Sequence, residues 1–345
     1  MPKNRVAIYS GVSEIGIREV DLTAPPPEFV ILDTRCSGVC GSDLHSYFGH
    51  WEQSREFAPG HEAAGVIHEL GKDVTGFRIG DRVTFECFSH CGNCVYCRQG
   101  LYNHCAEIGW VSRKGHGGFA KYSCVHYSSL FRMPQGMSFE QGALVEPLAV
   151  AYRAVARSAA CGRDRLAIIG GGTIGLLCLA VAKATGVKEA WITAKYDHQA
   201  SLAEELGADH VVRGGQTDLR HHVNKSTAGL GVDAVIECVG GGACFDDALA
   251  IVRRRGTVVL MAGYHGADSV HLGQVVSSEA AVTGSNCYSH TGLETDFQAS
   301  IDLIQSGKVD PTKLVTHRFG LEEISKAFKI AAGKSSGSIK VHICQ

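Results

Sequence analysis

The sequence lacks any excess of basic residues. Its 345 residues include 33 Lys and Arg against 35 Asp and Glu, which gives a formal net charge of -2. Because nucleic acids and anionic membranes are recognised by basic patches or stripes, we expect neither as a partner. A small, roughly neutral substrate fits this charge better.

Long apolar runs and a secretion signal are also missing. The first residues, Met1 to Ile8, do not resemble a signal peptide, and no apolar run is long enough to span a bilayer. We therefore expect no membrane partner and a cytoplasmic location. The chain shows no internal repeat or low-complexity tract, and its length favours two domains over one core.

Cysteine, in contrast, is plentiful, with 14 residues. In a chain without a secretion signal, this argues against a disulfide framework and favours thiols that bind metal or lie buried. Five cysteines have strongly patterned positions. For the others we predict small buried hydrophobes: Cys36, Cys87, Cys124, Cys161, Cys178, Cys238, Cys244, Cys287 and Cys344.

The pattern of elements changes along the chain. Residues 1–150 read as short β runs broken by glycine and proline, which predicts an irregular β domain. Glu140 to Ala160 predicts a connecting helix. Thereafter short apolar strands alternate with helices, which predicts an α/β fold with a parallel, doubly wound sheet. Two strand-like runs end the tail at 313–343 and could rejoin the first domain.

A four-cysteine segment is the strongest local signal. Its spacing is Cys91-x2-Cys94-x2-Cys97-x7-Cys105. Four thiolates so spaced can surround one zinc ion tetrahedrally and leave no coordination position open. We therefore predict a structural zinc site.

The glycine-rich segment 170–175 fits G-x-G-x-x-G between a predicted strand and a predicted helix. In that context the glycines allow a tight turn and close approach to a pyrophosphate at the helix N-terminus. We predict a dinucleotide site formed by Gly170, Gly172, Thr173, Ile174 and Gly175.

The end of the next strand bears on the choice of cofactor. An acid there would hold the ribose hydroxyl of NAD, but we place Ala194 at that position, followed by Lys195. A missing carboxylate removes repulsion of a 2′-phosphate and a lysine attracts it, so we expect NADP to be preferred. In the alternative, Lys195 is an ordinary solvated lysine, Asp197 replaces the acid and NAD is preferred.

The segment from Cys40 to Glu62 combines ligands that zinc prefers. We predict Cys40 and His61 as ligands, and three protein ligands with one open position would make a catalytic site. One carboxylate and one thiolate already neutralise a zinc ion, so a second carboxylate would leave the site negative. Glu62 and Glu146 are therefore expected to alternate, or one binds metal while the other holds its water.

Ser42 and His45 follow Cys40 by two and five residues. A hydroxyl can donate and accept, and an imidazole titrates near neutral pH, as a proton relay requires. The competing interpretation is a serine that stabilises a turn and a merely exposed histidine.

Together these motifs resemble the zinc-containing medium-chain dehydrogenases, closest to the sorbitol, polyol and threonine dehydrogenase branch. The resemblance also includes Gly80-Asp81-Arg82-Val83, Glu146-Pro147-Leu148 and the segment 314–319. It implies a GroES-like catalytic domain (1–150 and 286–345) with a structural zinc lobe at about 87–108, and a Rossmann domain (151–285). It also implies two zinc ions per subunit and a homodimer or homotetramer.

The family pattern assigns roles to individual residues. It makes Cys40, His61 and Glu62 or Glu146 the catalytic zinc shell, and Glu146 stands where other zinc alcohol dehydrogenases have a cysteine ligand. Tyr288 aligns with the tyrosine of an Arg-Tyr pair that contacts the polyol in sorbitol dehydrogenases. Cys287 replaces the arginine, which argues against sorbitol itself as the substrate.

The resemblance implies a zinc-dependent alcohol dehydrogenase. A zinc ion would polarise a secondary alcohol, hydride would pass to NADP, and the proton would leave through Ser42 and His45, with Glu62 completing the catalytic set. The substrate would be a polyol, cyclitol, sugar or amino alcohol, or the corresponding ketone. The rivals are a zinc-free enone or quinone reductase on the same fold and a non-catalytic protein that kept the fold.

Overall fold

The computed structural model describes residues 2–213, 216–264 and 266–345. The chain divides into two compact units. The first contains the residues up to Glu146 together with Asp310–Gln345, and the second contains Pro147–Val309. We had expected the divisions at 150/151 and 285/286. In the structure the second division comes later in the chain, after Val309, so helix α10 (Asp296–Gln305) belongs to the second unit.

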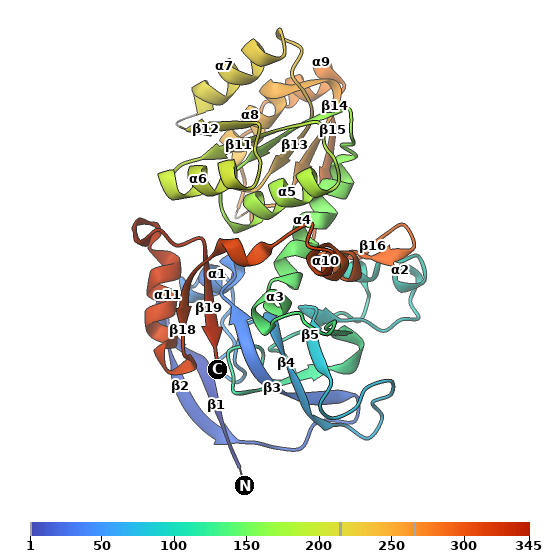
Figure 1. Ribbon diagram of the computed structural model, residues 1–345, viewed down its shortest axis with the longest axis vertical. Coiled ribbons are helices and arrows are strands. Elements are labelled where there is room, and N and C mark those ends of the chain that lie inside the picture. Colours follow the sequence, from blue (N-terminus) through green and yellow to red (C-terminus); the bar gives the residue numbers. More distant parts are fainter. Residues whose placement is uncertain (1, 214–215, 265) are drawn as a thin grey trace. The chain divides into compact units, whose positions relative to one another are not determined.

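The first unit is built on a seven-stranded sheet in which the end of the chain joins the beginning (Figure 1). Its order is β18-β19-β3-β4-β5-β9, and β8 also pairs with β3. The tail thus returns to the N-terminal part, because β19 lies antiparallel to β3 and parallel to β18. The strands are β3 (Phe29–Gly38), β4 (Glu62–Leu70), β5 (Arg82–Phe85), β8 (Tyr122–His126), β9 (Leu130–Arg132), β18 (Val315–Phe319) and β19 (Lys340–Cys344).

Strand β19 has one apolar and one polar face. Val341 and Ile343 are buried in a hydrophobic cluster with Phe328. Because side chains alternate along a strand, Lys340, His342 and Cys344 share the opposite face. Lys340 and His342 are nevertheless buried, at 2% and 0% exposure, so they need polar partners inside the unit.

Smaller elements complete the first unit. Two further antiparallel strand pairs belong to this unit, β1 with β2 and β6 with β7. The elements are β1 (Lys3–Gly11), β2 (Glu14–Asp21), α1 (Gly41–Tyr47), β6 (Phe88–Ser89), α2 (Val95–Arg98), η1 (Tyr102–His104), β7 (Gly109–Trp110), η2 (Tyr127–Ser129), α3 (Phe139–Ala143), η3 (Pro311–Leu314), η4 (Leu321–Glu323), α11 (Ile324–Ala332) and η5 (Lys334–Ser336).

The second unit confirms the predicted parallel, doubly wound sheet (Figure 1). Six parallel strands have the order β12-β11-β10-β13-β14-β15, which is the Rossmann order. Helix α5 packs on β10 and β11, α6 on β11 and β12, α8 on β13 and β14, and α9 on β14. These strands are β10 (Arg165–Ile169), β11 (Glu189–Ala194), β12 (His210–Arg213), β13 (Val232–Glu237), β14 (Val252–Leu260) and β15 (Ala281–Gly284).

The helices of this unit begin with α4 (Val145–Ser158). The single helix predicted from Glu140 to Ala160 is wrong in one respect, since α3 ends before Leu144 and α4 starts after it. The remaining elements are α5 (Thr173–Ala184), α6 (Asp197–Glu205), α7 (Gln216–Ser226), α8 (Gly242–Ile251), α9 (Leu272–Ser278), β16 (His290–Thr291), β17 (Glu294–Thr295) and α10. Across the described ranges, no helix has the length and apolar character that crossing a bilayer requires.

Candidate functional site

Cys40, His61 and Glu62 come together because β3 and β4 pair antiparallel. Gly38 lies opposite Glu62 in this pairing, so the end of β3 meets the start of β4. Cys40 follows β3 and caps α1, where its backbone N–H donates to Asp43 Oδ2 at 2.9 Å. The ligand atoms of Cys40, His61 and Glu62 all lie within 4.8 Å of one another. Sulfur, imidazole and carboxylate suit a zinc ion with one position left open.

Two neighbours hold the His61 ring. Asp43 Oδ1 lies 3.8 Å from His61 Nδ1, and Ser42 Oγ lies 3.4 Å from His61 Nε2. Burial lowers the pKa of His61, but the charges of Cys40 and Asp43 outweigh it and raise that pKa well above its ordinary value. A carboxylate behind a metal-binding imidazole fixes the ring and increases its basicity. We gave Asp43 no role from the sequence, although its position three residues after Cys40 was the available signal.

Lys340 is the partner of Glu62 that the sequence did not reveal. Its Nζ lies 2.8 Å from Glu62 Oε1 and 2.6 Å from Oε2, and it also donates to the Val39 carbonyl oxygen at 3.1 Å. Both side chains are buried. Burial raises the pKa of Glu62, but Lys340 and His61 outweigh burial and lower it. Glu62 is therefore held as a carboxylate.

Lys340 bears on the two glutamates, whose alternation at the metal stays a prediction. We had counted a zinc ion against Cys40 and one carboxylate only. Lys340 adds a buried positive charge beside Glu62, and the charges of Glu62 and Cys40 in turn raise the pKa of Lys340 against the effect of burial.

Glu146 lies in the first turn of α4 and is buried. Burial raises its pKa to about 7, and the charge of Glu62 raises it too, against the opposing charges of His61 and Lys340. Among the described residues, the potential metal-binding group that contains Cys40 and His61 includes Glu62 and does not include Glu146. A buried carboxylate of this kind is stabilised by an added cation.

Ser42 and His45 both lie on α1, three residues apart, and so share one face of the helix. Ser42 contacts His61, as described above. The His45 ring lies beside the rings of Trp51 and His50, with centroid distances of 5.0 and 5.9 Å. Both side chains are partly exposed, and their part in proton transfer stays a prediction.

The four predicted lobe cysteines also come together. The ligand atoms of all four lie within 4.8 Å of one another, and Cys91 Sγ lies 4.0 Å from Cys97 Sγ and 3.5 Å from Cys105 Sγ. Backbone N–H groups of Cys97 and Ala106 lower the pKa of Cys94 to about 6. This donor set fits a closed tetrahedral zinc site.

The glycine-rich turn has the predicted strand-turn-helix context. It joins the end of β10 at Ile169 to α5, which starts at Thr173. Gly170 has a φ of 113°, a conformation that favours glycine. A Cβ on Gly175 would collide with the Gly170 carbonyl oxygen, while one on Gly172 would meet nothing within 4 Å. Open space at Gly172, before a helix N-terminus, fits a pyrophosphate.

Strand β11 ends at Ala194, the position where we expected the missing acid. Ala194 is buried and Lys195 is exposed. The Lys195 Nζ lies 5.6 Å from the centroid of the Tyr196 ring, and no salt bridge of Lys195 occurs within the described part of the chain. Asp197 begins α6 and is exposed.

Tyr288 was predicted to contact the substrate, yet its side chain is 0% exposed. Its ring packs edge to face against Phe297, with centroids 5.4 Å apart. This burial favours a packing role. In this conformation Tyr288 exposes no surface that a substrate could contact.

Comparison with known proteins adds a second line of argument. The family model of the alcohol dehydrogenase GroES-like domain matches residues 26–135, and that of the zinc-binding dehydrogenases matches 173–306. A sorbitol dehydrogenase of Halalkalibacterium halodurans is 33% identical, over 98% of both chains. An L-threonine 3-dehydrogenase of Pyrococcus abyssi is 32% identical, over 98% of this chain and 99% of its own.

A solved structure shows the same likeness in three dimensions. It is a Sinorhizobium meliloti protein, described as a zinc-binding dehydrogenase and bound to NADP, with a TM-score of 0.90, 26% identity and full coverage of both chains, 100% each. These similarities and the family models support zinc and a nicotinamide cofactor, and an alcohol as the small-molecule substrate. The chain thus belongs to the zinc-containing medium-chain dehydrogenases, in the branch of the sorbitol and threonine dehydrogenases, and is an alcohol dehydrogenase.

Proposed function

We propose that the chain oxidises a secondary alcohol within a polyol, cyclitol, sugar or amino alcohol and transfers the hydride to NADP. In the reverse direction it reduces the corresponding ketone. The observation that carries this proposal is the cluster of Cys40, His61 and Glu62 with Ser42 beside it. The similarity to a sorbitol dehydrogenase and a threonine dehydrogenase supports the substrate class.

Two zinc sites are part of this proposal. Cys40, His61 and Glu62 hold the first, with Glu146 as a second carboxylate nearby and Lys340 fixing Glu62. The four lobe cysteines hold the second, which is structural. At the first site zinc supplies Lewis acidity, which favours the ionised form of a substrate hydroxyl.

The chain's own residues would move the proton. Ser42 Oγ, 3.4 Å from His61 Nε2, lies at the ligand cluster and can accept a proton from the substrate hydroxyl. His45, one helical turn further along α1 and partly exposed, can take the proton to solvent.

The preference for NADP rests on the end of β11. A buried alanine at position 194 offers no carboxylate to the ribose, and exposed Lys195 offers a cation to a 2′-phosphate. A hydrogen bond to a charged group contributes about 1.5–3 kcal/mol. This corresponds to a preference of roughly tenfold to a hundredfold in kcat/KM.

The test compares kcat/KM with NADP and NAD over a panel of polyols, cyclitols, amino alcohols and ketones. Lys195→Ala should lower kcat/KM for NADP about tenfold or more and leave that for NAD nearly unchanged. Ala194→Asp should reverse the preference. Lys188→Ala, an exposed lysine just before β11, serves as the control. A large preference of the unmodified enzyme for NAD would refute this part of the proposal.

A measurement of metal content tests the two proposed zinc sites. Two zinc ions per chain are expected, and full activity after complete removal of metal would favour the zinc-free reductase alternative. The homodimer or homotetramer and the cytoplasmic location stay predictions.

A further inference from the structure

We propose that Cys36 and Cys344 are a modification site, a dithiol that hydroperoxides oxidise to a disulfide between β3 and β19. This site is separate from the zinc and cofactor residues, and the inference does not depend on the substrate or cofactor proposed above. We had predicted both cysteines to be small buried hydrophobes, but the structure gives them polar partners.

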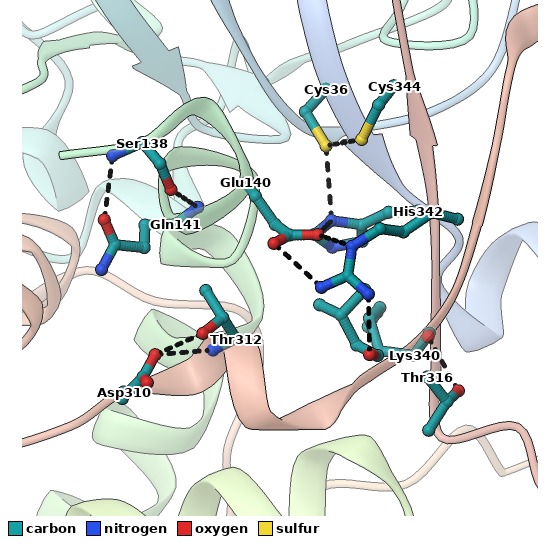
Figure 2. A network of polar contacts seen from close by, with 12 residues as sticks. Cys36, Ser138, Glu140, Gln141, Asp310, Thr312, Thr316, Lys340, His342 and Cys344 are labelled. Atoms are coloured by element: carbon teal, nitrogen blue, oxygen red, sulfur yellow. Dashed lines mark hydrogen bonds and ion pairs between the residues drawn. The ribbon is translucent and has the colours of Figure 1, made fainter.

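The register of the sheet places the two side chains opposite each other. Cys36 and Cys344 are direct partners in the antiparallel pairing of β3 and β19. Directly opposed residues have Cα atoms about 4.5–5.5 Å apart, within the range of about 4.4–6.8 Å that a disulfide requires. The two Sγ atoms are 2.7 Å apart, and Figure 2 shows them pointing toward each other.

The spacing of the sulfurs argues against a shared metal ion. Two thiolates about 2.3 Å from one tetrahedral zinc lie about 3.8 Å apart. The lobe cysteines meet this condition, with Cys91 Sγ at 3.5 and 4.0 Å from two partners. The separation of Cys36 and Cys344 is much shorter, so the pair is placed for a sulfur–sulfur bond.

His342 lies against the pair of cysteines. Its Nδ1 lies 3.3 Å from Cys36 Sγ, and its ring is fully buried. Glu140 Oε1 lies 3.6 Å from the same nitrogen (Figure 2), and Arg318 donates to both oxygens of Glu140. This chain of contacts holds the imidazole against the sulfurs.

These contacts give the two thiols different pKa values. Hydrogen bonds from Cys36 and then His342 lower the pKa of Cys344 to about 5, against the effect of burial. The contact with Cys344 and burial raise the pKa of Cys36. Cys344 is partly exposed and Cys36 is buried. Cys344 is therefore the thiolate that an oxidant meets, and Cys36 is the thiol that resolves the product.

The oxidation of the two thiols by a hydroperoxide proceeds in two steps. The Cys344 thiolate attacks one peroxide oxygen, the O–O bond breaks, and Cys344 becomes a sulfenic acid as hydroxide or alkoxide leaves and takes up a proton. Cys36 then attacks the Cys344 sulfur, the S–O bond breaks and water leaves as the S–S bond forms. Two electrons pass from the sulfur pair to the peroxide. The bond closes a loop across a separation of 308 residues and fixes the strand that carries Lys340.

The test treats the zinc-loaded full-length enzyme with stoichiometric hydrogen peroxide, blocks remaining thiols by alkylation and maps peptides by mass spectrometry without reduction. A linked Cys36–Cys344 peptide that dithiothreitol separates is expected. His342→Asn should slow its formation, because it removes one of the two side chains that stabilise the Cys344 thiolate. Cys161→Ser, which removes an exposed thiol elsewhere, should leave the link unchanged.

Two results would overturn the proposal. One is the recovery of alkylated, unlinked Cys36 and Cys344 at peroxide levels that oxidise other cysteines. The other is a fall in zinc content by one ion per chain in both Cys36→Ser and Cys344→Ser, which would make the cluster a metal site. Peptide mapping of the unmodified enzyme decides the question even if a variant fails to fold.

Discussion

The two predicted zinc clusters of the first unit are built in opposite ways. In the lobe, all four ligands come from one short segment, with Cys91 and Cys105 only 14 positions apart. At the cluster of Cys40, His61 and Glu62, the charge that balances Glu62 comes from Lys340, 278 positions away. A closed metal site can thus be encoded locally, while the charge of the proposed catalytic site depends on how the ends of the chain meet.

The two clusters also differ in how deeply their charged side chains are buried. Three of the four lobe cysteines are partly exposed, so water and backbone N–H groups share in stabilising their charge. Glu62 and Lys340 are 0% and 2% exposed. Losing one partner there leaves a buried charge without compensation, which costs far more than losing a surface ion pair.

The largest effect is expected from breaking the lobe. Cys97→Ser removes one ligand of a closed site, and structural zinc binding in small domains is worth about 10–16 kcal/mol. We expect zinc content to fall by one ion per chain and hydrogen exchange to accelerate within 91–105, with Cys161→Ser as the control. Retention of both zinc ions in Cys97→Ser would contradict a structural site.

The next largest effect is expected at the open cluster. Cys40→Ser should lower kcat/KM by about a thousandfold or more, because Lewis-acid stabilisation of several kcal/mol is lost. The circular dichroism spectrum should stay unchanged, since the lobe and both sheets remain intact. Cys124→Ser, on β8 and outside the cluster, is the matched control. Normal turnover by Cys40→Ser would end the zinc mechanism.

The next prediction compares the buried ion pair of Glu62 and Lys340 with an exposed ion pair. Lys340→Met removes the buried cation beside Glu62, and breaking a buried ion pair in this way costs about 3–5 kcal/mol. Lys326→Met, which breaks an exposed pair with Glu323, should cost at most about 1 kcal/mol. Urea denaturation of both variants measures the difference. Equal stability of the two would show that the tertiary pair is not needed.

The smallest expected effect is the contribution of Glu140 to the stability of the folded state, which depends on pH. The hydrogen bond from His342, followed by Arg318, lowers the pKa of Glu140 to about 2. A lowered pKa stabilises the folded state above the unfolded pKa of about 4.3, and this contribution is lost as the pH falls from there through about 2.

Comparing Glu140→Gln with the unmodified enzyme tests this dependence. The difference in urea midpoint should be present at about pH 6 and shrink as the pH falls below about 4.3. Glu322→Gln breaks an exposed pair with Arg5 and should show little difference at either pH. A difference for Glu140→Gln that stays constant with pH would contradict the assigned cause.

Local patterns predicted much of this molecule. The strand before Gly170 and the helix after it were read from apolar runs and a glycine turn, which depend on neighbours in sequence. The edge strands β12 and β15 were not predicted. Edge strands are short and partly exposed, so their apolar pattern is weak.

Long-range contacts account for the rest. Lys340 and His342 are ordinary polar residues in the sequence, and only the pairing of β19 with β3 turns one face of that strand toward Glu62, Glu140 and Cys36. The sequence by itself determined which residues are candidates for binding zinc and cofactor, because spacing and residue type set ligand chemistry. The tertiary structure alone decided how those residues are charged, because electrostatic energy depends on distance and burial, which no local pattern contains.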